Sequence, residues 1–153
     1  MKRISLKKVN ENDWEILTSI RNEQDNRDAS INSKVFSILG YKQYIKDQLQ
    51  ESRKNRHWSI CLDGKIIGHA KIINQELGYI ISKKFRNKGI GTKVIKKLFN
   101  EAAKLKFSKI YVIVKTDQPI ALWFALKNGF HMINLKKDKK KIIAYKLLKK
   151  IKE

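Results

Sequence analysis

The feature that most constrains the fold is a pair of glycines between a short apolar strand and a long amphipathic helix. The pattern predicts the strand over residues 76–81 and the helix over 89–105, joined by the run Arg86-Asn87-Lys88-Gly89-Ile90-Gly91. The start of a helix exposes unpaired N–H groups at the positive end of its dipole and therefore attracts anions. Glycine lets a phosphate group approach the backbone closely, because it has no Cβ atom. The run therefore predicts a phosphate-binding turn, to which Arg86 and Lys88 add charge and Thr92 adds a hydroxyl donor.

Hydrophobic periodicity elsewhere predicts one mixed sheet of about seven strands, flanked by about four helices. The clearest hairpin joins strands 57–62 and 65–73 through Asp63-Gly64, where glycine accepts the positive φ of a tight turn. The other strands are expected at residues 4–9, 109–114, 130–135 and 141–147, and the other helices at 14–20, 38–49 and 119–127. Asn12 or Asp13 is expected to cap the first helix. Residues 21–33 are polar and aperiodic, which predicts a loop or a broken helix. The order of elements indicates a single α/β domain over residues 1–153.

Composition narrows the class of protein. Hydrophobic residues make up 42% of the chain, which indicates a folded globule. Cys61 is the single cysteine and is expected in the core, so an internal disulfide is excluded. No His/Cys cluster has zinc-ligand spacing, and we expect no metal. No apolar run approaches the ~20 residues of a membrane span, and no secretory signal is recognisable. We therefore expect a cytoplasmic protein without a membrane partner.

The net charge of +21 raises nucleic-acid binding as a function, but the charge pattern does not favour it. The charge is spread along the chain and is carried mostly by lysine. Sequence-specific readers of nucleic acids favour arginine, whose planar head makes bidentate contacts. We interpret the lysines as a solvated surface that attracts anionic ligands such as CoA or nucleotide phosphates.

The run from Arg86 to Gly91 resembles the signature R/Q-x-x-G-x-G/A of the GNAT superfamily of N-acetyltransferases. The resemblance includes Glu76-Leu-Gly-Tyr79 before the run, and Gln118-x-x-Ala121 and Lys127-Asn-Gly-Phe130 after it. It therefore covers nearly the whole chain. It implies a mixed, mostly antiparallel sheet that is splayed in the middle, and acetyl-CoA as the cofactor.

The resemblance also implies where the cofactor binds. In relatives, the backbone amides of the signature hold the pyrophosphate, and pantetheine pairs with the preceding strand, here at Ile80, Ile81 and Ser82. This strand splays from residues 111–114, and the acetyl thioester lies in the gap. A β-bulge commonly produces such a splay. The cofactor site is completed by Gln118, Phe124 and Lys127, while Phe124 and Trp123 are expected as core or cofactor-wall residues.

Amine acetylation needs a neutral nitrogen, so a base must accept a proton from the ammonium form. Glu76 stands where relatives carry a glutamate with this role. The alternative for Glu76 is an ordinary surface glutamate at the start of a strand. His69, on the neighbouring strand, is the rival base, with a structural or surface role as its own alternative.

The chain departs from the family at Ala125, where many relatives have a tyrosine that protonates the departing thiolate. Gln118 also replaces the common asparagine. A free thiol has a pKa near ~8.5, so a CoA thiolate is a tolerable leaving group even without a donor. Two residues, Tyr79 and Tyr111, are candidates to compensate. The sequence leaves open which of them reaches the sulfur, because this depends on side-chain direction and on where the bulge falls.

The acceptor is the least constrained part of the interpretation. Arg21, Asn22 and Asn32 lie in the segment that covers the acceptor side in relatives, and His69 joins them in the predicted acceptor site. The runs Ile20-Arg21-Asn22 and Ser30-Ile-Asn-Ser33 resemble relatives that acetylate amino sugars on nucleotides. A nucleotide-linked amino sugar is therefore the leading small-molecule amine. A protein N-terminus, as in ribosomal-protein acetyltransferases, is the second hypothesis, and a non-catalytic CoA-binding or nucleic-acid-binding module is the third. The quaternary state is open, with a homodimer among the alternatives.

Overall fold

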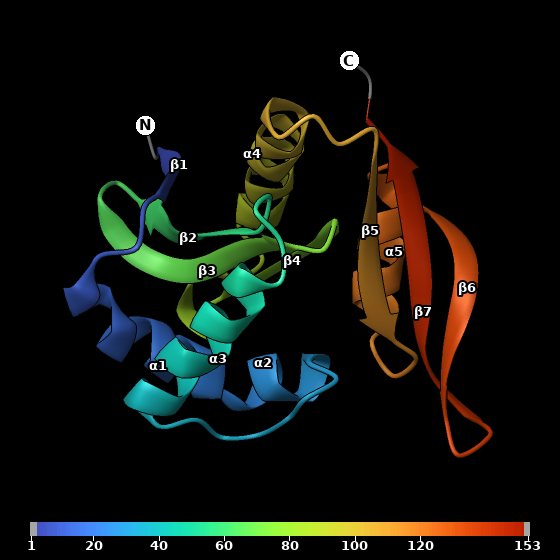
Figure 1. Ribbon diagram of the computed structural model, residues 1–153, viewed down its shortest axis with the longest axis horizontal. Helices are drawn as coiled ribbons and strands as arrows, with labels where there is room; N and C mark the ends of the chain where they lie inside the picture. Colours follow the sequence, from blue (N-terminus) through green and yellow to red (C-terminus); the bar gives the residue numbers. More distant parts are fainter. Residues whose placement is uncertain (1–2, 152–153) are drawn as a thin grey trace.

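A computed structural model describes residues 3–151, which form one seven-stranded sheet in the order β1-β2-β3-β4-β5-β7-β6 (Figure 1). The strands are β1 (Ile4–Lys7), β2 (Arg56–Leu62), β3 (Lys65–Ile73), β4 (Glu76–Ile81), β5 (Lys109–Lys115), β6 (His131–Asp138) and β7 (Lys141–Lys150). The helices are α1 (Trp14–Asn22), α2 (Gln24–Ala29), α3 (Ile38–Gln50), α4 (Ile90–Lys104) and α5 (Pro119–Lys127), with 3-10 turns at Glu11–Asp13 and Lys83–Phe85. Residues 1–2 and 152–153 of the expected domain lie outside the described residues.

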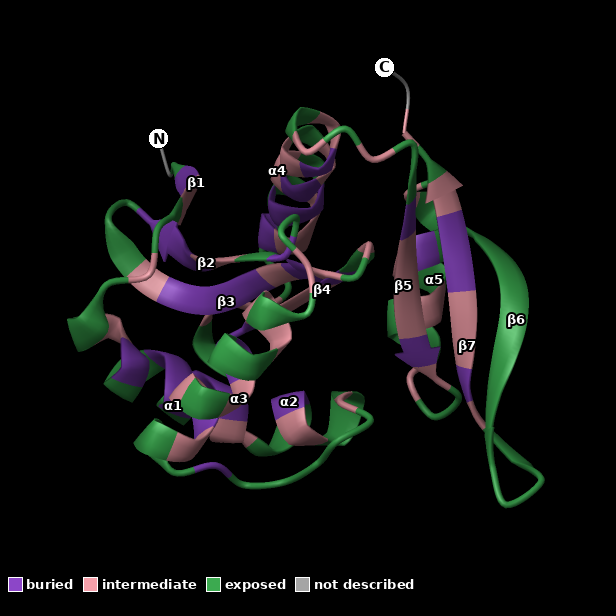
Figure 2. Cartoon of the chain, in the orientation of Figure 1, coloured by how far each residue is buried: buried purple, intermediate pink, exposed green. Residues whose placement is uncertain are grey.

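The helices cover both faces of the sheet. Helices α1, α2 and α3 lie on one face, and α4 and α5 on the other (Figure 1). The larger core packs the apolar stripe of α4, including Val94 and Leu98, against Ile72 and Ile110 of the sheet. A smaller cluster joins α1 and α3 around Leu17, Tyr41 and Ile45. The buried residues follow β3 and the inner side of α4, whereas every residue of β6 is exposed (Figure 2).

Most predicted elements are confirmed. The β2–β3 hairpin turns at Asp63 and Gly64, both with positive φ. Strand β4 and helix α5 have the predicted bounds, and α3 runs one residue further than predicted. Cys61 is buried, as expected of a core residue. Strand β6 runs three residues further than predicted, because it pairs with β7 up to a tight turn at Lys139 and Lys140. Strand β7 also runs three residues further, because residues 148–150 pair with the start of β5.

The segment predicted as a loop or broken helix is a broken helix. Helix α1 ends at Asn22, the backbone of Glu23 is extended (φ −56°, ψ 138°), and α2 follows as a fifth helix. The position of the α1 cap is as predicted, but its side chain does not bond the first turn of the helix. Asp13 occupies the N-cap position, but its carboxylate accepts a hydrogen bond from the N–H of Asn10, which closes the preceding 3-10 turn.

The sheet is splayed between β4 and β5, its only parallel neighbours among the described residues. A single residue pair, Glu76 with Tyr111, joins them, and the N–H of Tyr111 donates to the carbonyl oxygen of Gln75 at 3.0 Å. The expected bulge is absent from the pairing of β4 with β3, which keeps one register from Glu76 to Ile81. The splay therefore arises because β5 pairs fully with β7 and leaves β4 after the first residue.

Candidate active site

Two cavities lie on opposite sides of β4. The α3-side cavity has a volume of about 380 Å³ and is lined by residues of α1, α3, β3, β4, β5 and the segment 29–32. The α5-side cavity, of about 540 Å³, is lined by α2, β4, the turn before α4 and α5. Ala29, Tyr79 and Ile80 line both cavities. The two cavities therefore meet across β4, beside the gap between β4 and β5.

The turn before α4 has the backbone that the glycines predicted. Gly89 is the N-cap of α4 with φ 73°, and Asn87 also has positive φ at 61°. Gly91 lies close to Tyr79 and Phe124, which line the α5-side cavity. A Cβ atom added to Gly91 would come within 3.2 Å of the Tyr79 hydroxyl and 3.6 Å of the Phe124 ring. A larger residue at Gly91 would fill this space. The first turn of α4 thus presents N–H groups at a place where neither Gly89 nor Gly91 has a side chain in the way.

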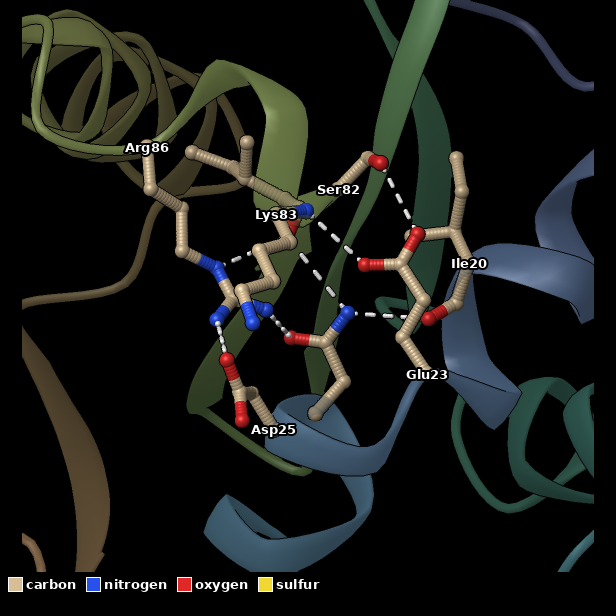
Figure 3. A network of polar contacts seen from close by, with 8 residues as sticks. Ile20, Glu23, Asp25, Ser82, Lys83 and Arg86 are labelled. Atoms are coloured by element: carbon tan, nitrogen blue, oxygen red, sulfur yellow. Dashed lines mark hydrogen bonds and ion pairs between the residues drawn. The ribbon is translucent and has the colours of Figure 1, made fainter.

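The signature arginine is bonded to α2 rather than free at this turn. Arg86 donates from Nη1 to Asp25 at 2.9 Å, from Nη2 to Asn26 Oδ1 at 2.7 Å, and from Nε to the carbonyl oxygen of Ile81 at 3.2 Å (Figure 3). Lys88, two residues later, is exposed and lies 5.8 Å from the centroid of the Phe85 ring. Lys88 is therefore the cation of the turn that remains available to an anion.

Ser82 is also held from the α1–α2 junction. Its hydroxyl donates to the carboxylate of Glu23 at 2.8 Å, and the other oxygen of that carboxylate accepts from the N–H of Lys83 at 2.8 Å (Figure 3). The backbone of Glu23 is extended where α1 ends and α2 begins. Its carboxylate therefore connects the break between the two helices to the end of β4.

The remaining candidates for cofactor binding divide into two groups. The α5-side cavity is lined by Ile80, Ile81, Arg86, Asn87, Gln118 and Phe124. The side chain of Ile90 is instead buried in the larger core, while Lys127 lies over the Trp123 ring at 4.9 Å. Of the two roles expected for Trp123, core or cofactor wall, the structure favours the wall, since the residue is 61% exposed and lines the α5-side cavity. Ala125 is buried in the core.

The structure decides which way the two candidate tyrosines point. Tyr79 packs with the larger core on the α4–α5 face, and its hydroxyl lies beside Gly91. Burial raises the pKa of Tyr79 to about 12. Tyr111 pairs with Glu76 across the single β4–β5 bridge, and Lys146 lies 4.4 Å from the centroid of its ring. Only Tyr79 therefore lines the α5-side cavity.

Glu76 lines the α3-side cavity at the start of β4. Although the residue is exposed by surface area, the cavity walls around its carboxyl raise its pKa, while Lys136, Lys71 and Lys146 oppose that rise. Lys71 of β3 lines the same cavity and donates to Gln48 Oε1 at 3.1 Å. Burial lowers the pKa of Lys71 to about 8, against the attraction of Glu76. The cavity thus holds a carboxyl, Glu76, whose pKa burial raises, and an amine, Lys71, whose pKa burial lowers.

Arg21 and Asn32 both line the α3-side cavity, whereas Asn22 does not. Arg21 is only 6% exposed; its Nη2 donates to the carbonyl oxygen of Asn32, and its Nη1 is buried with no hydrogen-bond partner among the described residues. Asn22 has a structural role, since its side chain bonds both the N–H and the carbonyl oxygen of Phe36. Arg21 forms none of the ion pairs found within residues 3–151.

His69 is the centre of a buried hydrogen-bonded chain. Its Nδ1 is 2.8 Å from the Tyr41 hydroxyl, and its Nε2 is 3.1 Å from Nδ1 of His57. His69 is 1% exposed, and burial, reinforced by His57 and Lys71, lowers its pKa well below the ordinary value. Burial also lowers the pKa of His57 to about 4. The pair is therefore neutral at pH 7, and His69 reaches the cavity only as part of its wall.

Sequence reasoning missed Lys71, Tyr41 and the acidic end of α2. Lys71 is two positions after His69 on β3, and side chains two positions apart in a strand lie on the same face of the sheet. The sequence could therefore have placed Lys71 beside His69. No comparable signal pointed to Asp25 and Asn26, because their partner Arg86 is about 60 residues away in the chain.

The residues present fit a CoA-type cofactor on the α5 side. The turn before α4 offers backbone N–H groups, and the glycines leave room. An apolar wall from α5 lines the same cavity as Ile80 and Ile81 of β4, whose edge toward β5 is unpaired beyond Glu76. Among the described residues, no group of three His, Cys, Asp or Glu side chains is arranged to hold a metal ion. None of the helices within residues 3–151 is both long and apolar enough to cross a membrane.

Comparison with known proteins gives a family match and a fold match. Residues 14–130 match the model of the Acetyltransferase (GNAT) family. A spermidine N-acetyltransferase from Vibrio cholerae, solved with CoA and spermine, is 15% identical with a TM-score of 0.80, over 97% of this chain and 95% of that one. A GNAT-family acetyltransferase from Streptococcus pneumoniae is 17% identical with a TM-score of 0.74, over 98% and 100%. A ribosomal-protein-alanine N-acetyltransferase from Brucella melitensis is 16% identical with a TM-score of 0.77, over 95% and 99%.

Proposed function

This chain belongs to the GNAT family of acetyltransferases, and from that premise we propose that it acetylates a primary amine on a molecule that also carries an anionic group. Membership makes the chain an acetyl-CoA-dependent N-acetyltransferase. The leading acceptor is a nucleotide-linked amino sugar, whose phosphates supply the negative charge.

The observation that carries this proposal is the charge of Arg21 in the α3-side cavity, which forms no ion pair with any residue in the described range 3–151. A buried guanidinium without a carboxylate costs free energy unless a ligand supplies the negative charge. Lys71 is a second partly buried cation that lines this cavity, and among residues 3–151 Glu76 is the only acidic one that does. A polyamine needs several acidic partners, so this lining favours an acceptor that carries a phosphate or carboxylate.

The cofactor is assigned to the α5 side, where it supplies the acetyl group as an activated thioester. Gly89, Gly91 and the first N–H groups of α4 would hold its pyrophosphate, with Lys88 as the nearest free cation. Asn87, Gln118 and Phe124 would line its path, and Thr92 offers a further hydroxyl. Ile80 and Ile81 would pair with the pantetheine along β4, whose edge toward β5 is open beyond Glu76.

We assign the role of base to Glu76. Its carboxyl group lines the α3-side cavity, and a raised pKa improves its match to an ammonium proton. Lys71, on the neighbouring strand β3, lines the same cavity; with its pKa lowered to about 8, it keeps the wall cationic below that pH. His69 is not favoured as the base, because its two ring nitrogens are already bonded to Tyr41 and His57.

We assign the cofactor side to Tyr79 and the acceptor side to Tyr111, which pairs with Glu76. The Tyr79 hydroxyl lies beside Gly91, at the part of the path assigned to the pyrophosphate rather than to the thiol. With a pKa of about 12, Tyr79 keeps its proton and would donate a hydrogen bond to the cofactor. We therefore do not assign it the role of acid for the leaving thiolate.

A protein N-terminus is the second candidate acceptor. It is favoured by the likeness of the fold to a ribosomal-protein-alanine N-acetyltransferase from Brucella melitensis. An N-terminal peptide brings one ammonium group and no required anion, so it leaves Arg21 without a partner. This is the physical reason for ranking it second.

An acceptor panel tests the proposal through the release of CoA. The panel contains UDP-glucosamine, glucosamine 6-phosphate, unmodified glucosamine, spermidine and a peptide with an N-terminal alanine. We expect the two phosphorylated amines to have the highest kcat/KM. Arg21→Gln should raise KM for UDP-glucosamine about tenfold or more, ~1.4 kcal/mol, and leave KM for glucosamine nearly unchanged. Preference for spermidine or the peptide, unaltered by Arg21→Gln, would overturn it.

A further inference from the structure

Helix α2 is bonded to both sides of the gap between β4 and β5. On the β4 side, Arg86 bonds the side chains of Asp25 and Asn26 (Figure 3). On the β5 side, Lys115 Nζ donates to the carbonyl oxygen of Asp28 at 2.7 Å. The strands themselves share a single residue pair, so they do not fix the width of the gap beyond Glu76. The short helix spans the opening that the sheet leaves.

The bonds on the β4 side use all three nitrogens of the Arg86 guanidinium. Bonds from arginine to a carboxylate are among the stronger hydrogen bonds in proteins, and the fork geometry fixes direction. Asn26 is 5% exposed and donates in turn to the carbonyl oxygen of Ile20 at 2.8 Å and to that of Ile81 at 3.4 Å. Arg86 is therefore part of a closed network that joins α1, α2 and the end of β4.

Helix α2 also forms a wall of both cavities. Asp25, Asn26 and Asp28 line the α5-side cavity, and Ala29 lines both. The next three residues, 30–32, line the α3-side cavity, and Asn32 holds Arg21 through its carbonyl oxygen. Any displacement of α2 relative to β4 must therefore move the wall that carries the predicted acceptor contacts.

We propose that α2 is a bridge across the β4–β5 gap, and that Arg86 and Lys115 are positioning residues that set the acceptor wall relative to the acetyl group. Arg86 thus acts on the acceptor side, although it lies in the phosphate-binding signature. This inference rests on the proposed function for the meaning of the two cavities. The bonds that define the bridge do not depend on the identity of the acceptor.

Two charge-removing substitutions in the same turn separate the bridge from phosphate binding. Arg86→Gln removes the bonds to Asp25, and glutamine is one of the two residues that the family signature allows. Lys88→Gln removes the same charge two residues away, from a side chain without a bond to α2. We expect Arg86→Gln to change the Kd for CoA by less than about threefold and to raise KM for UDP-glucosamine at least about fivefold. Lys88→Gln should instead raise the Kd for CoA and leave the KM for UDP-glucosamine nearly unchanged.

Hydrogen exchange gives a readout that needs no acceptor. The amides of residues 24–32 should exchange faster in Arg86→Gln and in Lys115→Met than in the parent, because the anchors hold the helix against local opening. Lys88→Gln should leave this exchange unchanged. Asp25→Asn should also speed exchange, and should tighten CoA binding, since it removes a carboxylate from the α5-side cavity and frees Arg86.

The outcomes distinguish the bridge from the proposed function. If Arg86→Gln weakens CoA binding at least about tenfold while exchange over 24–32 stays at the parent rate, Arg86 is a phosphate ligand and the bridge is wrong. The bridge is also wrong if Lys115→Met leaves both exchange and acceptor KM unchanged. If the parent binds CoA but acetylates no amine of the panel, the proposed acceptor class fails while the exchange result still decides the bridge.

Discussion

The two cavities on either side of β4 are built in different ways. The α5-side cavity takes most of its lining from two short runs of the chain, 79–87 and 118–124, with α2 added across the gap. The α3-side cavity is assembled from six parts of the chain between Arg21 and Ile113. A phosphate-binding turn needs backbone N–H groups and room, which a few consecutive residues provide. A selective cavity needs side chains of chosen charge, and these come from elements that meet only in the folded protein.

Because they are built differently, the α5-side and α3-side cavities should respond separately to substitution. Backbone geometry dominates the α5 side, and buried charge dominates the α3 side. Changes in one should therefore alter cofactor affinity, and changes in the other should alter acceptor kinetics. Helix α2, which lines both cavities, is where this separation should fail.

The largest effect is expected for Gly89→Val. Gly89 has φ 73°, and no heavy atom lies within 4 Å of a Cβ atom added there, so the cost is backbone strain rather than a clash. A β-branched residue resists this conformation. The first N–H groups of α4 should lose their alignment, and the Kd for CoA should rise about 10²-fold or more by calorimetry. Circular dichroism should report an intact fold. Affinity equal to the parent would place the cofactor away from this turn.

The next effect is expected for Glu76→Gln on the α3 side. The pKa of Glu76 is raised, so the parent base gains its negative charge, and activity should rise, as pH increases through that value. Lys71, Lys136 and Lys146 act in the opposite direction by holding the pKa down. The variant should lose about 10²-fold in turnover below the pKa of the acceptor amine, and much less at high pH, where the amine is already neutral. Unchanged CoA affinity is the control, and a pH–rate profile identical to that of the parent would remove Glu76 from the mechanism.

A smaller effect is expected for the two tyrosines. A CoA thiolate is a tolerable leaving group, so we expect Tyr79→Phe and Tyr111→Phe each to lower turnover less than about tenfold, under ~1.4 kcal/mol of barrier. Single-turnover kinetics would separate an effect of Tyr79→Phe on the chemical step from an effect on cofactor binding. Tyr111→Phe should act on acceptor KM, through Glu76 and Lys146. A loss of a hundredfold in Tyr79→Phe with cofactor affinity intact would make Tyr79 the acid.

The smallest effect on turnover is expected for Ala125→Tyr, which restores the residue of many relatives. Ala125 is 5% exposed in the larger core, so the new ring must displace its neighbours. Overpacking of this kind typically costs ~1–3 kcal/mol, which denaturant unfolding would measure. Turnover at high pH should change little. A clear rise in turnover with unchanged stability would mean that the ring reaches the thiol side after all.

Local patterns predicted most of the fold. The β2–β3 hairpin, β4, α3 and α5 follow from alternation, helical periodicity, turn glycine and a proline at a helix start, all of which act over a few residues. The break at Glu23 could not be located from the sequence, because Glu23 is bonded to Ser82, which is 59 residues away in the chain. The splay was expected from family resemblance, but the expected bulge in β4 is absent.

The candidate site divides in the same way. The run from Arg86 to Gly91 marked the turn, but only the structure revealed that Arg86 is bonded to α2. Arg21 and Glu76 were singled out by resemblance. The structure adds that both line one cavity together with Lys71. His69 was a candidate base in the sequence, and its two bonds make it part of the wall.

By itself the sequence determined the family, the order of the elements and the position of the phosphate-binding turn. These depend on the conformational preferences of consecutive residues and on the spacing of apolar side chains. Both follow from the order of residues alone. The tertiary structure decided which charges are paired, that Tyr79 but not Tyr111 lines the α5-side cavity, and what holds α2 across the gap. Pairing and burial are properties of residues tens of positions apart, so no local pattern records them. The direction of Tyr79 and Tyr111 was decided only when β4 and β5 took their register.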